Sequence, residues 1–228
     1  MSTDTPNPAD MRINYDKDQL IETDLASTPL AQFTKWLSEA VAVGKDELIE
    51  PNAMVIAVRS HDDVLSTRSV LLKGVDARGL TFYTNYGSTK SNAIDENPQV
   101  SVTFPWYPLH RQVNIVGTAT KVSREESAAY FNTRPHGSKL GAIVSAQSAP
   151  IDSREVLETR MAELEAQYPE GSQVPLPDAW GGYLIAVESI EFWQGRRSRL
   201  HDRLRFIRSG TSHDISDAAA WKVIRLSP

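Results

Sequence analysis

The sequence contains no cysteine among its 228 residues, which excludes disulfides, thiolate zinc sites and cysteine nucleophiles. It also lacks any apolar run long enough to cross a bilayer. The amino end has neither the basic nor the apolar region of a signal peptide. A formal net charge of -5 argues against a general nucleic-acid binder, which would need an excess of basic surface. These absences predict a soluble, cytoplasmic protein that binds neither nucleic acid nor membrane.

Several common catalytic motifs are missing as well. No Gly-x-Gly-x-x-Gly follows a predicted strand, and Gly87-Ser-Thr-Lys90 lacks the upstream glycine that a Walker phosphate loop requires. A Gly-x-Ser-x-Gly nucleophile elbow is absent. The histidines at positions 61, 110, 136, 201 and 213 show no ligand-like spacing, so we expect no metal site. A nucleotide cofactor would therefore need another mode of binding.

Short runs rich in Val, Leu, Thr and aromatic residues, separated by turn signals, predict a succession of strands. Their close spacing favours a barrel over an α/β layer, and strands on both sides of the helical region indicate one sheet system. We therefore expect a mainly β, α+β fold in which residues 12–228 form a single domain after a flexible tail at 1–11. The predicted strands are 53–59, 66–73, 80–85, 100–104, 112–122, 182–187, 190–194, 204–208 and 221–226.

Capping signals predict three helices between these strands. A threonine followed by proline opens the first, and two capping-box patterns open the others. Residues 88–96 are expected to be a polar connection instead. The predicted helices run from Thr28-Pro29 to Gly44, from 123–126 through Phe131, and from 152–155 to about Gln167.

The segment 192–203 concentrates positive charge, with four arginines, one histidine and one tryptophan beside a single carboxylate. These guanidinium groups repel one another unless solvent, carboxylates or an anionic ligand neutralises them. One interpretation is an exposed cationic turn, in which the arginines are solvated. The indole of Trp193 near the titratable His201 favours a site for an anionic aromatic ligand instead.

Two other groups of basic and hydroxyl side chains lie near the ends of predicted elements. Arg68 and Lys73 point to opposite faces of one strand, and both could be edge charges that discourage aggregation. Tyr130 and Arg134 share one helix face, with Ser138 just beyond. This trio could chelate a phosphate, or Tyr130 could pack on the barrel while Arg134 satisfies the helix C-terminus.

Short motifs follow one another along the chain in a characteristic order. They are RSVLLK at 68–73, FYTN at 82–85, GSTK at 87–90, FPW at 104–106, RQV at 111–113, RP at 134–135, QS at 147–148, VPLP at 174–177, WGG at 180–182, EFWQG at 191–195, RLHDR at 199–203 and RLSP at 225–228. From about residue 12 to its end, the chain thereby resembles the FMN-dependent pyridoxine/pyridoxamine 5'-phosphate oxidase family. The resemblance implies a Greek-key-like, FMN-binding split β-barrel with flanking helices. It also implies a homodimer with FMN at the subunit interface.

The resemblance further implies roles for individual residues. Arg199 and His201 would be the catalytic residues, which orient the substrate ring and its departing proton. The FMN contacts would be Arg68, Ser69, Val70, Leu71, Leu72, Lys73, Tyr83, Thr84, Thr89, Lys90, Gln112, Gln147, Ser148, Trp193 and Arg203. The substrate contacts would be Arg12, Tyr15, Lys73, Tyr130, Arg134, Ser138, Arg199, Leu200 and His201.

Two places depart from the family pattern. Thr89 stands where these oxidases typically have an arginine before the lysine, so a hydroxyl replaces one cationic contact to the FMN phosphate. At the amino end, only Arg12 and Tyr15 of the segment 12–15 keep the family's character. We assign these two residues as lid contacts over the substrate.

The implied reaction converts pyridoxine 5'-phosphate or pyridoxamine 5'-phosphate to pyridoxal 5'-phosphate in vitamin B6 biosynthesis and salvage. The substrate gives a hydride from C4' to N5 of FMN, and O2 reoxidises the flavin to give H2O2. Two alternatives remain open. One is a related split-barrel flavin oxidase of the phenazine-biosynthesis type, against which the 199–201 match and the phosphate trio argue. The other is a non-catalytic module that binds flavin or pyridoxal phosphate.

Overall fold

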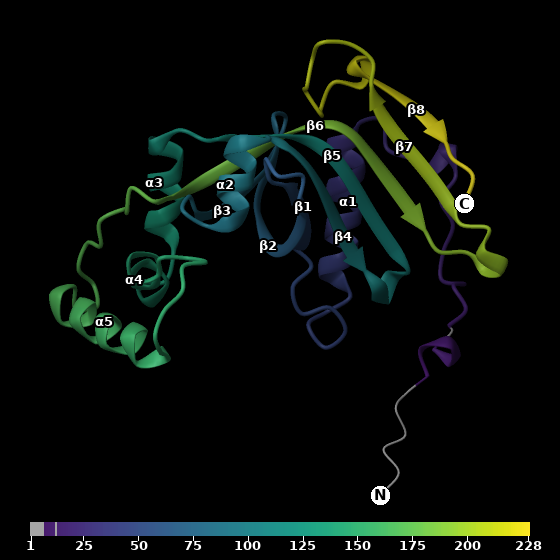
Figure 1. The fold of residues 1–228 in the computed structure, drawn as a ribbon. Coiled ribbons are helices and arrows are strands. Elements are labelled where there is room, and N and C mark those ends of the chain that lie inside the picture. The colour runs from purple at the N-terminus through teal and green to yellow at the C-terminus, as the bar shows by residue number, and fades with distance from the viewer. Residues whose placement is uncertain (1–6, 12) are drawn as a thin grey trace, which may run out of the picture.

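The computed structural model of the protein describes residues 7–11 and 13–228 and contains a closed, six-stranded antiparallel β-barrel with flanking helices (Figure 1). The barrel follows the order β3-β2-β1-β4-β5-β6, and pairing between β3 and β6 closes it. Strands β7 and β8 continue the sheet beyond β6, so the predicted barrel is confirmed. The strands are β1 (Ala53–Arg59), β2 (Leu65–Asp76), β3 (Gly79–Asn85), β4 (Gln99–Trp106), β5 (Arg111–Lys121), β6 (Trp180–Gln194), β7 (Asp202–Arg208) and β8 (Trp221–Arg225).

The first four strands form a Greek key. β1, β2 and β3 are joined by two hairpins, and β4 returns to pair with the free side of β1. The returning connection contains helix α2 (Thr89–Glu96), where we expected only a polar segment. That expectation was wrong because α2 buries mostly polar or small side chains, which leave no apolar period in the sequence. The helix places Lys90 and its own N-terminus beside β3.

Strand β6 spans the molecule from one end to the other (Figure 1). It pairs with β3 at 180–185, with β7 at 189–194, and with β5 along most of its length. The prediction of two strands here was wrong. A β-bulge at Glu188, where the register with β5 shifts, interrupts the alternation of buried residues without ending the strand.

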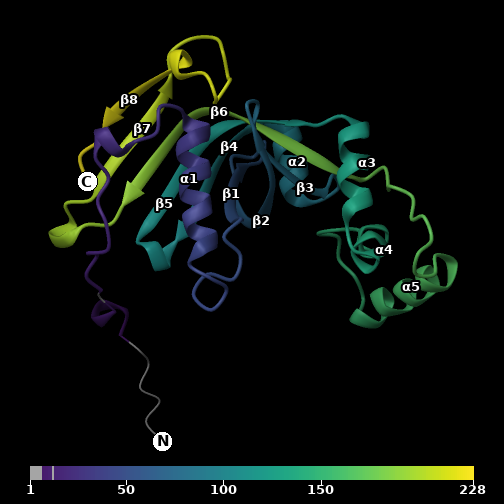
Figure 2. The ribbon, with the colours of Figure 1, turned by 180° about the vertical axis from the view of Figure 1, so that it is seen from behind.

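The helices lie on two sides of the barrel. Helix α1 (Pro29–Ala42) packs against the sheet through Phe33 and Trp36, which contact the rings of Phe104 and Phe192 (Figure 2). The other long helices gather at the end opposite β7 and β8 (Figures 1 and 2). These are α3 (Arg124–Thr133), α4 (His136–Val144) and α5 (Arg154–Gln167). Short 3-10 helices occupy Pro8–Asp10, Glu22–Asp24, Tyr107–Leu109, Arg197–Arg199 and Ala218–Ala220.

Capping chemistry explains which helices the sequence predicted. The side chains of Thr28 and Ser123 accept backbone N–H bonds at 3.1 Å, so α1 and α3 begin as predicted. Helix α5 begins after Ser153 without a side-chain cap, one residue later than its capping box predicted. Helix α4 follows Pro135 directly and also has no side-chain cap, so it was not predicted.

Two hydrophobic clusters hold these elements together. The larger one fills the barrel and the face of α1. The smaller one joins α3, α4 and the loop after α5 around Phe131, Leu140, Val174 and Trp180.

Within the described ranges, no helix has the length and apolar character to cross a membrane. The boundary between tail and domain at residue 12 stays a prediction, and residue 12 itself lies outside the described ranges.

We expect Gly79→Ala to lower the free energy of unfolding by more than about 1 kcal/mol. Gly79 opens β3 with a φ of +137°, and an added Cβ would collide with the backbone carbonyl of Ile185 across the β3–β6 closure. Gly137 in α4 is the matched control, because nothing lies within 4 Å of a Cβ added there. Gly137→Ala should be neutral or stabilise by up to about 1 kcal/mol. Urea denaturation measures both, and equal unfolding midpoints would contradict this account of the closure.

Candidate active site

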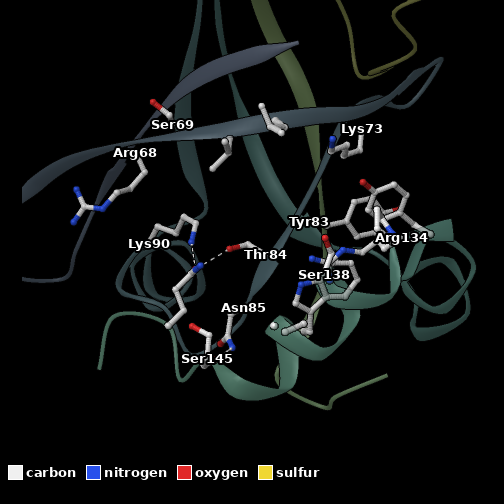
Figure 3. A pocket seen from close by; sticks show the side chains of 18 of the residues that line it. Arg68, Ser69, Lys73, Tyr83, Thr84, Asn85, Lys90, Arg134, Ser138 and Ser145 are labelled. Carbon is white, nitrogen blue, oxygen red and sulfur yellow. Dashed lines mark hydrogen bonds between the residues drawn. The ribbon is translucent and has the colours of Figure 1, made fainter. Parts of the chain in front are cut away.

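A cavity of about 840 Å³ opens between the barrel and the helices α3 and α4. Its walls come from strands β2 and β3, helices α3 and α4, the start of α2, and the loop before α5. Segments distant in sequence therefore meet here (Figure 3). This cavity brings together most of the predicted cofactor residues and the predicted phosphate trio. The predicted residues that line it are Arg68, Ser69, Val70, Leu71, Lys73, Tyr83, Thr84, Lys90, Tyr130, Arg134, Ser138, Gln147 and Ser148.

At one end of the cavity, Lys90 is buried, and its hydrogen-bond partners in the described part of the chain are neutral acceptors. Its amino group donates to Ser88 Oγ at 2.9 Å and to Gln147 Oε1 at 2.6 Å, and the hydroxyl of Thr84 donates to the same Gln147 oxygen at 3.2 Å (Figure 3). Burial lowers the pKa of Lys90 to about 8, and the charge of Arg68 acts in the same direction. An ammonium group in this setting suits a phosphate, because no carboxylate within residues 7–11 and 13–228 pairs with it.

At the other end, Arg134 enters the cavity with part of its guanidinium buried. Its Nη1 has no hydrogen-bond partner among the described residues. Burial lowers the pKa of Arg134, while Tyr130 acts in the opposite direction. Lys73 and Ser138 line the same region (Figure 3). A buried cationic donor without a partner is costly, and an anionic ligand would supply the missing acceptor.

Five further predicted site residues, Tyr15, Gln112, Trp193, Arg199 and His201, line a second cavity of about 540 Å³ at the far end of β6. Trp193 lies beside His201, with ring centroids 4.6 Å apart, and Tyr15 meets both rings edge-on. Gln112 and Arg199 line the same cavity. Leu200 lies next to it and is 70% exposed, so its side chain is available to a ligand or a second subunit.

His201 carries its hydrogen on a defined nitrogen. The backbone N–H of Arg196 donates to Nδ1 at 3.0 Å, so a neutral ring has its proton on Nε2. Burial lowers the pKa of His201, Arg199 lowers it further, and Asp202 only partly opposes them. Asp202 pairs with Arg225 at 2.8 Å rather than with Arg203. His201 is therefore a neutral donor at physiological pH, and the carboxylate that follows it in sequence is occupied elsewhere.

Three predicted cofactor residues line neither cavity. Arg203 forms a bidentate ion pair with the buried Glu191, in which Nε and Nη2 donate to the two carboxylate oxygens at 2.9 and 3.1 Å. Its Nη1 donates to the Ser227 carbonyl. Leu72 is buried in the barrel core. Thr89 begins α2, where its backbone N–H donates to Ser148 Oγ at 3.3 Å.

The segment before α1 forms one wall of the second cavity. Arg197 pairs with Asp16 at 3.0 Å, and Arg196 donates to the Asp18 carbonyl at 2.9 Å. These two arginines thus hold the segment that carries Tyr15. The predicted lid residue Arg12 lies outside the described residues.

Sequence reasoning assigned no role to several residues at the site. Asn85 lines the first cavity and donates to the Ser145 carbonyl at 3.1 Å. Trp180 lines it as well, and its motif with the two following glycines was the signal that could have identified it. Glu191, the partner of Arg203, belongs to a recognised motif too.

In the described ranges, no three His, Asp or Glu side chains are grouped as a metal site.

The two cavities lie far apart in one chain. Trp180, at the first cavity, begins β6, and Trp193, at the second, lies near its end. At about 3.3 Å per strand residue, roughly 40 Å of strand separates them. A single small ligand cannot bridge this distance, so the two sets of residues can act on one ligand only if two subunits supply them.

Two family models match the chain. Residues 43–168 match the model described as pyridoxamine 5'-phosphate oxidase. Residues 180–228 match the pyridoxine 5'-phosphate oxidase C-terminal dimerisation region. The second match begins at the first residue of β6 and includes β7 and β8, which supports a homodimer.

Curated relatives match over nearly their whole length. A pyridoxine/pyridoxamine 5'-phosphate oxidase of Streptomyces avermitilis is 48% identical over 223 residues, which are 97% of this chain and 96% of that protein. A protein of the same name from Rubrobacter xylanophilus is 50% identical over 220 residues, with 96% of each chain covered. These relatives support an oxidoreductase, and the family implies a flavin cofactor.

Solved structures agree on the fold. PhzG from Burkholderia lata, in complex with tetrahydrophenazine-1-carboxylic acid, aligns with a TM-score of 0.81 at 29% identity, covering 92% of this chain and 98% of that one. A pyridoxamine 5'-phosphate oxidase-related, FMN-binding protein from Nostoc punctiforme aligns with a TM-score of 0.68 at 13% identity, covering 86% of this chain and 97% of that one. By its family models, relatives and fold, the chain belongs to the pyridoxamine 5'-phosphate oxidase family.

Proposed function

We propose that this protein oxidises pyridoxine 5'-phosphate and pyridoxamine 5'-phosphate to pyridoxal 5'-phosphate, with FMN as cofactor and O2 as the final electron acceptor. The alcohol and O2 give the aldehyde and H2O2, and the amine consumes one water as well and releases ammonia. One observation carries the proposal. The first cavity presents two separate cationic groups, Lys90 with Arg68 and Arg134 with Lys73, which have no carboxylate partners among the described residues. Cofactor and substrate each bear one phosphate, so a site for both needs two such groups.

The residues around Lys90 fit FMN. The amino group, the Ser148 hydroxyl and the start of α2 offer donors to a phosphate, and the β2 backbone at 68–71 lines the same wall. Thr89 offers a hydroxyl and no charge, so Lys90 and Arg68 would carry the charge interaction. When bound, FMN supplies the hydride acceptor that the side chains of this chain lack.

The residues around Arg134 would bind the substrate. Arg134, Lys73, Tyr130 and Ser138 would hold its 5'-phosphate, which fixes the distance of the ring from the cofactor. The neutral His201, with its proton on Nε2, would donate to the ring or its substituents, and Arg199 beside it would orient them. Trp193, Gln112 and Arg203 would complete the cofactor site. Because these residues lie at the other end of β6, the second subunit of a homodimer would supply them.

A second candidate is an oxidase of phenazine type, since PhzG has a closely similar fold. The oxidases named for pyridoxine and pyridoxamine 5'-phosphate are more similar in sequence, at 48–50% against 29% identity. A second cationic group suited to a phosphate also favours the B6 substrates. The non-catalytic alternative would keep both groups and show no turnover.

The first test is turnover by the purified protein. We expect a yellow protein with about one FMN per chain that forms pyridoxal 5'-phosphate and H2O2 when pyridoxamine 5'-phosphate is added in air. Absorbance of the product and a peroxidase-coupled assay measure the two products. Flavin-loaded protein that forms neither would exclude this function. Turnover of a dihydrophenazine carboxylic acid alone would favour the second candidate.

Lys90→Met should weaken FMN binding by about 10- to 100-fold at pH 7, because a charge-assisted hydrogen bond is lost. The FMN affinity of the unaltered protein should fall as pH rises through about 8, where Lys90 loses its charge, and this dependence should flatten in the variant. Lys222→Gln, on exposed β8, is the matched control. Fluorescence titration of FMN measures all three proteins, and an unchanged pH profile in Lys90→Met would refute this role.

The same substitution should raise the unfolding temperature of the FMN-free protein at pH 7. The folded-state pKa of Lys90 is lowered from 10.5 to about 8, so the cost of burying its charge is fully present below pH 8. That cost disappears as pH rises toward 10.5. The stabilisation by Lys90→Met should therefore be largest near neutral pH and shrink above pH 9. Stability and FMN affinity thus move in opposite directions, which a purely structural lysine would not produce.

Mixed dimers test whether two subunits share each site. Arg134→Ala removes a residue of the first cavity and Arg199→Ala one of the second, so each variant alone should have little activity. In dimers formed from both, one of the two sites would be intact. We expect co-refolded protein to recover up to about a quarter of the unaltered activity, because half the dimers are mixed. No recovery, despite mixed dimers detected by affinity tags, would show that each chain builds its own site.

A further inference from the structure

We propose that Trp180 is a positioning residue that fixes Arg134 for the substrate phosphate through the face of its indole ring. Because the ring is neutral, it holds the guanidinium without cancelling the charge that the phosphate would bind. This inference rests on the proposed function, in which Arg134 binds the phosphate. No role in that function has been given to Trp180.

The contact between the two side chains is direct. The guanidinium carbon of Arg134 lies 4.7 Å from the centroid of the Trp180 ring, within the range of a cation–π interaction. It lies 5.6 Å from the ring of Phe131. Trp180 itself is only 5% exposed, so the interaction is largely shielded from water. A shielded cation–π contact is stronger than one at the surface.

The plane of Trp180 is held by its neighbours. Its ring is nearly parallel to those of Tyr83 and Tyr130, at 12° and 8°, with centroid distances of 5.5 and 6.2 Å. Phe131 meets it edge-on at 5.1 Å. The glycine at 182 leaves room for this packing, since an added Cβ would lie 2.7 Å from the Tyr83 ring. The ring therefore offers a fixed surface rather than a mobile one.

The guanidinium groups of Arg134 and Arg203 are held by different kinds of side chain. Arg203 is held by the carboxylate of Glu191, which also pairs with Arg205. The Nη1 of Arg134 is buried without a partner in the described part of the chain, and an aromatic face supports the group instead. A carboxylate at this position would compete with the phosphate for the same donors. An aromatic face attracts the cation only through its quadrupole, so the full charge remains for the ligand.

Substitutions at Trp180 should change substrate binding more than chemistry. In the FMN-loaded enzyme, Trp180→Leu should raise KM for pyridoxamine 5'-phosphate by roughly 2- to 30-fold, which corresponds to loss of a cation–π contact. Trp180→Phe keeps a smaller ring and should raise KM less. In both variants kcat and the FMN content should stay within about twofold, because the phosphate contact is equally present in the ground and transition states. An unchanged KM in Trp180→Leu would overturn the proposal.

A matched control separates positioning from packing. Val174 belongs to the same small hydrophobic cluster but does not line the cavity. Val174→Ala should lower the unfolding temperature and leave KM unchanged. If Val174→Ala raised KM as much as Trp180→Leu, the effect would come from general loosening of the cluster, and the proposal would fail.

A double-mutant cycle tests whether Trp180 acts through Arg134. Arg134→Ala should raise KM, and adding Trp180→Leu to it should raise KM no further. Independent, multiplicative effects of the two substitutions would overturn the proposal. This readout stays meaningful if Trp180→Leu lowers stability, because both arms of the cycle carry the same loss of packing.

Direct binding separates this inference from the proposed function. Titration calorimetry with inorganic phosphate on the FMN-loaded protein needs no turnover. Unaltered protein should bind phosphate more tightly than Trp180→Leu, and in the Arg134→Ala background the Trp180 substitution should make no difference. If the protein oxidises neither B6 substrate, the proposed function fails while this comparison still decides the role of Trp180. Equal phosphate affinity with and without the Trp180 ring would refute the positioning role.

Discussion

Strand β6 imposes the constraint on which the rest of the structure depends. It closes the barrel by pairing with β3, supports β7 at its other end, and pairs with β5 between them. One 15-residue strand therefore carries Trp180 to the first cavity and Trp193 to the second. Because a strand is stiff and extended, the two groups of site residues cannot meet within one chain. The length of β6 thus makes association of two chains a requirement of the proposed site, not an addition to it.

The charge of the protein is compatible with this site because its positive groups are arranged selectively. The chain has a net charge of -5, yet the first cavity gathers Arg68, Lys73, Lys90 and Arg134. Elsewhere, acidic side chains pair with arginines, as Glu188 does with Arg208. The lowered pKa of Lys90 shows that burial acts against its charge in the absence of a ligand. The protein therefore keeps an unfavourable arrangement that an anionic ligand would relieve, which is typical of a binding site rather than of a core.

The sequence predicted the parts of the fold that have local signals and missed those that depend on tertiary contacts. Strands such as β1 and the caps of α1 and α3 were correct because alternation and a capping hydroxyl are local. Helix α2 was missed because its buried face includes Lys90, whose burial reflects the site and not hydrophobicity. For the site, motifs indicated most lining residues of the first cavity. They could not reveal that Glu191 pairs with Arg203 and Arg205, because that pairing depends on the register of β6 and β7.

Two arginines of the recognised motifs, Arg111 and Arg134, have different roles, and their partners distinguish them. Arg111, in the RQV motif, is 7% exposed and contacts Glu39, Asp18 and Gln194 while stacking over Trp36. Two carboxylates neutralise it, so it joins α1, the segment before α1 and the end of β6. A buried arginine so paired is costly to disturb, which suits a structural joint. Arg134 has an aromatic face and, among the residues that the structure describes, no carboxylate partner, so its charge remains available. For Arg111 and Arg134, the partners thus separate a structural joint from a group that is available to a ligand.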